Sequence, residues 1–317
     1  EIAQCLVGSE MCIRDRSVIG CGTKDTKEQD AYRQYGITCM ESGKYEDAVK
    51  AFQNALGESI GHIGEKELDI CFYKAKAQAL DGKTKDALAT YDAIIKYNKD
   101  ARAYYLRGDL YMDMGEEKKG KADFESAVQH GKKNYEIYIG IYESLSRHEK
   151  KDEGQKYLSA AMEIKGDKPE DELYKGRISY LLGENKDAIS YLEKAKEHKQ
   201  MLASYYLGLA YDANGDSDKA KKCIAEYIKS GVATSYDLYE LGMQEMQDGN
   251  YKNALTYFNS GLELEKVPNK QNLMKSAIAA YEYSGDFDSA KKMMKEYLKA
   301  YPDDEEAKHE NTFLETR

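Results

Sequence analysis

The feature that most constrains the fold of this chain is a spacing pattern in residues 104–127. Small and aromatic residues recur there at intervals of three, four and seven, which keeps them on one face of a helix. The pattern consists of Tyr104, Gly108, Tyr111, Gly115, Gly120, Phe124 and Ala127. Gly115 marks a turn, because a helix commonly ends at a left-handed residue, a conformation that glycine adopts without strain. The stretch therefore predicts two helices that pack closely on either side of a tight turn.

This pattern resembles the signature of the tetratricopeptide repeat (TPR) family, and it recurs along most of the chain. From the third unit to the seventh the spacing stays close to the 34-residue TPR period. The resemblance implies an all-α fold, a right-handed superhelical solenoid of about eight helix–turn–helix units with a capping helix at 303–317. We place the array at 31–302, with units near 29–56, 68–100, 101–134, 135–168, 169–200, 201–234, 235–270 and 271–302.

Scaffold positions carry the repeat signature, because small side chains let two helices approach and an aromatic ring fills the space beside them. The fourth unit departs from the pattern, since its turn carries Glu149 where glycine is usual. Asn98, Gly131 and Gly231 fall where one unit ends and the next begins, and these residues tolerate the left-handed conformation expected there. The scaffold residues are Gly36, Ala48, Gly108, Gly115, Phe124, Gly208, Gly215, Ala220, Gly242, Ala254 and Ala290.

The N-terminal residues carry two further resemblances. Residues 10–16 resemble a translated sequencing adapter, and we exclude residues 1–16 from the fold. Residues 17–30 follow as a lipobox remnant and polar tether, because Val18 to Cys21 resemble the lipobox of bacterial lipoproteins. That resemblance implies a lipid on Cys21 and attachment to the extracytoplasmic face of a bacterial cell membrane. The alternative is an unmodified cysteine in the tail of a cytoplasmic protein.

Composition narrows the function classes. The formal net charge is −10 with both signs interspersed, whereas nucleic-acid binding requires a clustered basic face. No run of about 20 apolar residues is present, so no transmembrane helix is predicted. Cys39, Cys71 and Cys223 fall on buried-type repeat positions and are odd in number, which favours unpaired core thiols.

The TPR resemblance also implies which residues face a ligand, because the first helix of each unit lines the concave face in this family. Phe72, Tyr105, Tyr205 and Tyr239 share one position and would form an aromatic ladder suited to peptide contact. The alternative is that these rings pack between helices. The predicted groove residues are Arg33, Phe72, Tyr105, Asp109, Met112, Arg177, Tyr180, Tyr205, Tyr239, Met243 and Met246.

Two specific activities find no support in the sequence. Chaperone-tail-binding TPRs resemble each other in a carboxylate clamp of Lys and Asn, whereas Arg33 and Ile37 occupy the corresponding first-unit positions. The five histidines show no metal-ligand spacing, and no G-x-S-x-G, phosphate-binding loop or H-E-x-x-H motif occurs. We therefore predict neither enzyme activity nor a bound metal or cofactor.

The sequence thus favours a non-catalytic scaffold that binds a protein or peptide in the groove and is lipid-anchored in the bacterial cell envelope. Two alternatives stay open at this point. One is a cytosolic TPR regulator that binds a peptide or a signalling protein. The other is an accessory subunit of an envelope enzyme.

Overall fold

The computed structural model describes residues 27–59, 63–166 and 168–317, so the predicted lipobox and Cys21 lie outside the described residues. Within those ranges every regular element is a helix. The helices are α2 (Lys27–Glu41), α3 (Tyr45–Gly57), α4 (Glu65–Leu80), α5 (Thr84–Asn98), α6 (Ala101–Asp113), α7 (Glu117–His130), α8 (Tyr135–Arg147), α9 (Lys151–Met162), α10 (Pro169–Leu182), α11 (Asn185–Glu197), α12 (Leu202–Ala213), α13 (Ser217–Lys229), α14 (Ser235–Gln247), α15 (Tyr251–Leu262), α16 (Lys270–Tyr283), α17 (Phe287–Ala300) and α18 (Glu305–Leu314).

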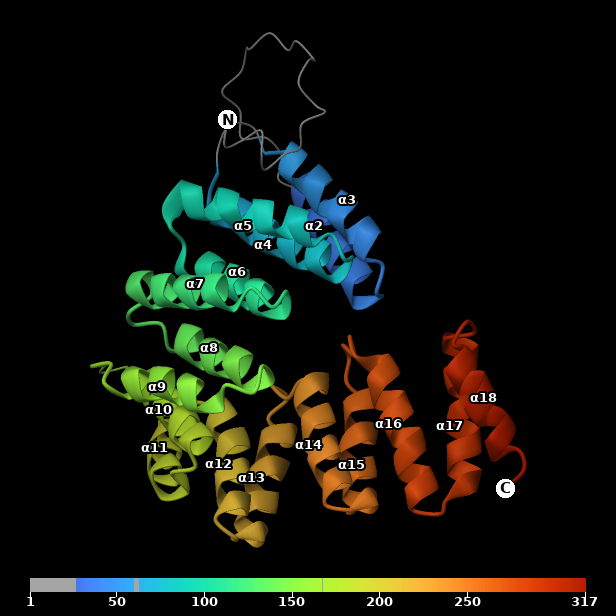
Figure 1. Ribbon diagram of the computed structural model, residues 1–317. Coiled ribbons are helices and arrows are strands. Elements are labelled where there is room, and N and C mark those ends of the chain that lie inside the picture. Colours follow the sequence, from blue (N-terminus) through green and yellow to red (C-terminus); the bar gives the residue numbers. More distant parts are fainter. Residues whose placement is uncertain (1–26, 60–62, 167) are drawn as a thin grey trace. The chain divides into compact units, whose positions relative to one another are not determined.

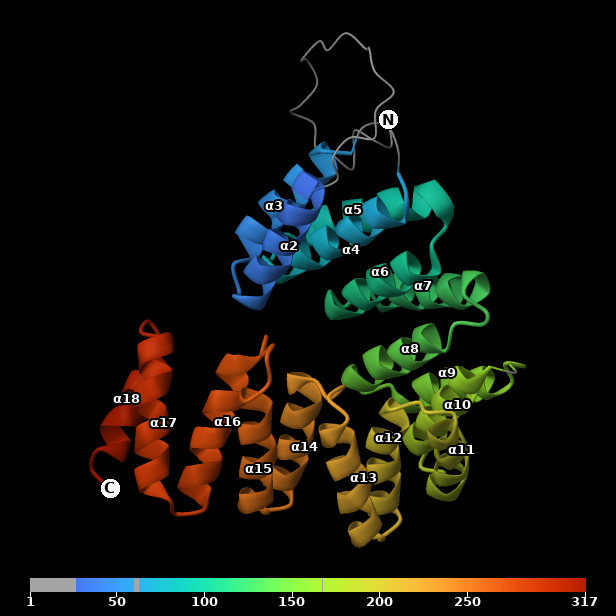
Figure 2. The same cartoon turned by 180° about the vertical axis from the view of Figure 1, so that it is seen from behind.

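These helices form consecutive pairs, each joined by a short turn (Figure 1 and, from behind, Figure 2). The chain divides into two compact bodies, which we describe separately. The N-terminal body extends to Lys221, and the C-terminal body runs from Lys222 to Arg317. Eight pairs followed by α18 confirm the predicted all-α fold of about eight helix–turn–helix units with a C-terminal helix.

The turn inside each pair uses the same backbone geometry. At the third pair, the Gly115 N–H donates to the Met112 carbonyl oxygen at 2.9 Å and the Glu116 N–H to the Tyr111 oxygen at 2.8 Å. Gly115 has a φ of +75°, and the corresponding glycines of six other pairs have φ between +70° and +86°. These bonds satisfy carbonyls that the end of a helix would leave without donors.

The fourth pair makes the same turn without glycine. Glu149 has a φ of +61°, and the Lys150 N–H donates to the Leu145 carbonyl oxygen at 2.8 Å. A Cβ atom in the left-handed region costs roughly 1 kcal/mol. The packing of α8 on α9 therefore imposes a conformation that the glutamate itself disfavours.

We expect Glu149→Gly to raise the free energy of unfolding by about 1 kcal/mol, since glycine adopts this φ without the Cβ contact. Urea denaturation followed by circular dichroism measures the change. The matched control is Glu149→Ala, which removes the same carboxylate but keeps Cβ. Equal stabilisation by both variants would assign the effect to charge and contradict the conformational explanation.

The junctions between pairs correct part of the sequence prediction. Gly231 has the predicted left-handed φ of +77°, but between the second and third pairs this conformation falls on Lys99 and not on Asn98. Gly131 has a φ of −109°, so it is not left-handed. A Cβ atom there would lie 2.6 Å from Cδ1 of Ile137, so close packing is the reason for a glycine at this position.

Inside four of the eight pairs, a glycine of the first helix contacts a large buried side chain of the second. A Cβ atom on Gly36 would lie 2.6 Å from the Phe52 ring, and one on Gly242 would lie 2.2 Å from the Phe258 ring. Gly108 and Phe124 repeat this contact, as do Gly176 and Leu192. Ala48, Ala254 and Ala290 are fully buried. Cys39, Cys71 and Cys223 are also buried, and none of the three forms a disulfide with another described residue.

In the fourth pair the large residue lies on the first helix and the small residue on the second. Tyr142 stands in α8 where glycine is usual, and its ring is buried against Leu158. Space for it comes from Gly154 in α9, where a Cβ atom would lie 3.0 Å from Cδ2 of Tyr142. The degenerate sequence of this unit therefore exchanges large and small residues between two helices that still pack closely.

In the C-terminal body, α18 covers the apolar end of the last pair. Ala307 and Leu314 are buried with Met294 and Tyr297 in one core cluster. Asp304 begins the helix: it accepts a hydrogen bond from the Ala307 N–H at 3.1 Å, and one from the Tyr297 hydroxyl at 2.5 Å. These hydrogen bonds and Lys275, 2.9 Å away, hold the pKa of Asp304 below its usual range. α18 thus acts as the cap that a helical array requires at its end.

Glu282 of α16 gives this body a pH-dependent stability. Burial and the neighbouring carboxyl of Glu310 in α18 raise the pKa of Glu282 to about 7, and its Oε1 is buried with no hydrogen-bond partner in the described residues. Because the folded state binds this proton more tightly than the unfolded state, the contribution is fully present below about pH 4.5. It is lost as the pH rises through about 7.

We expect Glu282→Gln to leave stability nearly unchanged at pH 5 and to raise it by about 1 kcal/mol at pH 8, a figure reduced for partial solvent exposure. Thermal unfolding at pH 5, 6, 7 and 8 measures the difference. Glu296→Gln, an exposed carboxylate on α17, is the control. A gap between wild type and Glu282→Gln that stays constant across this range would contradict a raised pKa.

Candidate peptide-binding site

Ion pairs join the first helices of successive pairs in the N-terminal body. Arg33 of α2 binds Asp69 of α4, with a nitrogen–oxygen distance of 2.6 Å. Asp109 of α6 and Arg147 of α8 are also 2.6 Å apart. Glu143 of α8 then binds Arg177 of α10 at 2.8 Å. The surface made by these helices therefore carries paired charges at three of its steps.

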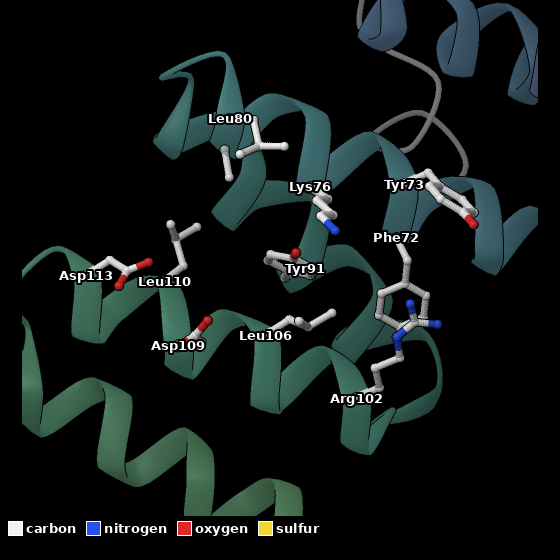
Figure 3. Close-up of a pocket in the computed structure, with 11 residues that line it drawn as sticks. Phe72, Tyr73, Lys76, Leu80, Tyr91, Arg102, Leu106, Asp109, Leu110 and Asp113 are labelled. Atoms are coloured by element: carbon white, nitrogen blue, oxygen red, sulfur yellow. The ribbon is translucent and has the colours of Figure 1, made fainter. Parts of the chain in front are cut away.

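The step from α4 to α6 is different, because a pocket of about 470 Å³ lies there. α6 packs closely against α8, whereas α4 and α6 stand further apart. Figure 3 shows side chains of both helices facing the opening, with Tyr91 of α5 reaching between them. The lining residues are Phe72, Tyr73, Lys76, Ala79, Leu80, Tyr91, Arg102, Leu106, Asp109, Leu110 and Asp113.

Aromatic and aliphatic side chains make the walls of this pocket. The Arg102 guanidinium lies over the Phe72 ring, with 4.3 Å between its carbon and the ring centroid (Figure 3). Leu80 is exposed at the rim, and Leu106 and Leu110 are half-buried on α6. Pockets that combine apolar walls with a few polar groups are typical ligand sites in proteins.

The polar groups of the pocket fall into two sets. Asp109 and Asp113 both lie within ion-pair distance of Arg147, at 2.6 and 3.7 Å, and His148 lies 3.1 Å from Asp113. Neither Lys76 nor Arg102 makes an ion pair with a described residue. The pocket therefore holds two basic groups, Lys76 and Arg102, that are not paired with its own acidic residues.

Tyr91 contributes a hydroxyl group to the lining of the pocket. Its side chain is 4% exposed and lines the pocket, yet this hydroxyl makes no hydrogen bond with any residue that the structure describes. Burial raises the pKa of Tyr91 above its ordinary value, so the hydroxyl stays protonated at physiological pH. The hydroxyl oxygen is open to the pocket, so it can donate a hydrogen bond to a ligand there.

The predicted groove residues of the N-terminal body lie in different environments. Phe72 and Asp109 line the pocket, but Met112 is buried between α6 and α7, where a Cβ on Gly120 would lie 2.8 Å from its sulfur. Tyr105 stacks on Phe124 with ring centroids 6.3 Å apart. Its hydroxyl end packs against Gly140 of α8, where an added Cβ would lie 2.6 Å from Cζ. Met112 and Tyr105 therefore serve helix packing.

The remaining groove residues of this body lie further along the chain. Arg177, besides its ion pair with Glu143, lies over the Tyr206 ring at 5.4 Å. Tyr180 is half-buried, and burial raises its pKa. Tyr205 is half-buried and meets Tyr206 edge-on, with centroids 5.1 Å apart. Their role in ligand binding stays a prediction.

In the C-terminal body, the predicted groove residues are half-buried on α14. Tyr239 lies beside Phe258, with ring centroids 6.2 Å apart. Met243 accepts a hydrogen bond at its sulfur from the Ser276 hydroxyl at 3.6 Å, and Met246 borders the same core cluster. These contacts connect α14 to α15 and α16. A ligand would meet only the outer edges of these side chains.

Among the lining residues that sequence reasoning missed are Lys76, Tyr91 and Arg102. Lys76 and Arg102 occupy the same offsets from a unit start as the predicted groove residues, so the register alone could have selected them. Nothing in the sequence shows that they lack acidic partners. Tyr91 belongs to the second helix of its unit, which no concave-face rule would include. Its contribution depends on the separation between α4 and α6.

The described residues contain no group of three or more His, Cys, Asp or Glu side chains placed to hold a metal ion. Over the same ranges, no helix combines the length and the apolar character that crossing a membrane requires.

Comparison with solved structures returns helical-repeat proteins at low sequence identity. A tetratricopeptide repeat protein from Parabacteroides merdae is 12% identical, with 80% of this chain and 99% of that chain covered and a TM-score of 0.47. PilW, a type IV pilus biogenesis factor, is 17% identical, with 66% and 97% covered and a TM-score of 0.43. The C-terminal part of a TPR protein from Cytophaga hutchinsonii is 14% identical, with 77% and 98% covered and a TM-score of 0.38.

The comparison with curated proteins found no match. Three family models, each described as tetratricopeptide repeat, match residues 36–95, residues 101–129, and residues 202–230 with 271–304. These segments cover helix pairs in both bodies of the all-α array. The chain belongs to the tetratricopeptide repeat family.

Proposed function

We propose that this chain is a non-catalytic scaffold that binds a peptide segment of a partner protein on the face formed by the first helices of its repeats. TPR proteins are in general protein-interaction scaffolds, and one observation supports a specific anchoring point. That observation is the pocket between α4 and α6, where apolar walls surround the Tyr91 hydroxyl and two basic groups that make no ion pair with a described residue.

The proposal extends to location. The lipobox resemblance supports a lipid on Cys21, which would tether the scaffold to a bacterial cell membrane and make it an assembly adaptor of the envelope. Incorporation of a labelled fatty acid by the protein expressed behind its genomic upstream sequence, and its loss in Cys21→Ser, tests this part. Equal incorporation by both proteins would contradict it, and a cytosolic regulator would then be favoured.

Peptide binding is tested by selecting ligands from a random peptide display library with the full chain. Hydrogen exchange should then show protection by a selected peptide in α4 and α6. Leu106→Trp, which fills the pocket, should weaken binding at least tenfold. Leu202→Trp, at an exposed position on α12, is the control. Failure to select any peptide, or binding that Leu106→Trp leaves unchanged, would reject the α4–α6 pocket as the anchoring point.

A further inference from the structure

The chemistry of the α4–α6 pocket specifies one class of side chain, an inference that rests on the proposed peptide binding. Lys76 and Arg102 offer only hydrogen-bond donors, and neither makes an ion pair with a described residue. Tyr91 adds a hydroxyl that can donate a third hydrogen bond. A group that complements all three must be an acceptor, and the two positive charges favour an anionic one.

Neighbouring steps of the array show how equivalent positions are satisfied. Lys76 directly follows the small residue Ala75, as Asp109 follows Gly108 in α6 and Arg177 follows Gly176 in α10. Asp109 and Arg177 each bind an opposite charge on a neighbouring first helix. Lys76 holds the same place in α4, but the pocket separates it from α6. A carboxylate in the pocket would give Lys76 the ion pair that its counterparts already have.

The acidic residues in the pocket do not compete for this role. Asp109 and Asp113 are both within ion-pair distance of Arg147, at 2.6 and 3.7 Å, and Asp113 also contacts His148. The positive charges of Lys76, Arg102 and Arg147 outnumber the negative charges of Asp109 and Asp113 by one. The pocket is therefore positive on a chain whose net charge is −10. A positive site on an acidic protein selects against basic ligands and attracts acidic ones.

The walls add an apolar requirement. Phe72, Leu106 and Leu110 form a surface beside the charged groups, and Leu80 continues it to the rim. We propose that this pocket binds an Asp or Glu side chain of the partner peptide, with Lys76, Arg102 and the Tyr91 hydroxyl as donors and an adjacent apolar side chain against the leucines.

Two matched probes test the proposal by fluorescence anisotropy with the full chain: labelled peptides that differ only in a central Leu-Glu-Leu or Leu-Gln-Leu. The Glu peptide should bind about tenfold more tightly, since one charge-assisted hydrogen bond is worth about 1.5 kcal/mol or more. Its affinity should fall with added KCl more steeply than that of the Gln peptide. Equal affinities would overturn the proposal.

Two pocket variants and one control test which residues bind the glutamate side chain. Lys76→Gln and Tyr91→Phe should each weaken the Glu peptide about tenfold and leave the Gln peptide nearly unchanged. Tyr91→Phe should keep the melting temperature of the wild type, because no hydrogen bond within the described residues is lost. Lys85→Gln, an exposed lysine on α5, should change neither affinity. Loss of stability in Tyr91→Phe would show that its hydroxyl already has a partner, which would overturn its proposed role.

The outcomes separate this inference from the proposed function. If both peptides bind equally and Leu106→Trp abolishes both, the pocket binds peptides but does not select an acid. If neither peptide binds while library peptides protect α4 and α6, the scaffold function holds and acid recognition is wrong. If no peptide binds at this surface at all, both proposals fail.

Discussion

Replacing Phe124 by alanine should lower the free energy of unfolding by about 4 kcal/mol, the cost typical of removing a buried phenylalanine. The Phe124 ring is fully buried in α7 and packs against Gly108 and Tyr105 of α6. Gly108, which lies directly against the ring, has no side chain that could move into the space. The cavity therefore stays largely unfilled.

Urea denaturation followed by circular dichroism measures this loss, and Phe313→Ala is the matched control. Phe313 has the same side chain but is 45% exposed on α18, so its loss should cost less than 1 kcal/mol. A second comparison tests the contact directly: Gly108→Ala should cost less in a Phe124→Ala background than in the wild type. Strictly additive effects would show that the glycine is not there to accommodate the ring.

Asp123→Ala should lower the free energy of unfolding by about 3 kcal/mol, because it leaves a largely buried guanidinium without its main partner. Arg107 of α6 donates two hydrogen bonds to Asp123 of α7, from Nε at 2.7 Å and Nη2 at 2.6 Å. The two side chains are 18% and 9% exposed, respectively. The hydrogen bond to Asp123 and that to exposed Asp92 raise the pKa of Arg107, so it cannot respond by losing its proton.

The reason for this loss can be tested by removing the stranded charge. Adding Arg107→Met to Asp123→Ala should recover part of the stability, since a buried ion pair can be replaced by apolar side chains at little cost. The control is Glu46→Gln, which breaks the solvent-exposed pair with Lys50 and should leave the free energy of unfolding nearly unchanged. A double variant as unstable as Asp123→Ala alone would show that the carboxylate acts through something other than Arg107.

The scaffold was readable from the sequence because TPR packing is local and repeated. Gly36 and Phe52, or Gly242 and Phe258, are separated by one helix and one turn, so their spacing in the sequence fixes their contact in space. The turn glycines were readable for the same reason. Glu149 shows how strongly the packing of a helix pair imposes the turn. Its backbone takes the left-handed conformation although its side chain disfavours it.

The pocket could not be read in this way, because it depends on how two neighbouring hairpins approach each other. The sequence placed Phe72, Tyr105, Tyr205 and Tyr239 at one equivalent position, yet Tyr105 packs on Gly140 of the next repeat while Phe72 borders an opening. The difference arises from side chains on neighbouring helices, which the repeat signature does not constrain.

By itself, then, the sequence determined the helices, their turns and the close glycine contacts inside hairpins such as Gly36 on Phe52, since all of these act over short distances along one chain. Only the tertiary structure decided that Lys76 and Arg102 make no ion pair within the part of the chain that the structure describes, and that the Tyr91 hydroxyl lies in a pocket. Those properties belong to the space between α4 and α6. Its width is set by packing between repeats, which is the sum of many side-chain contacts and not the property of any one motif.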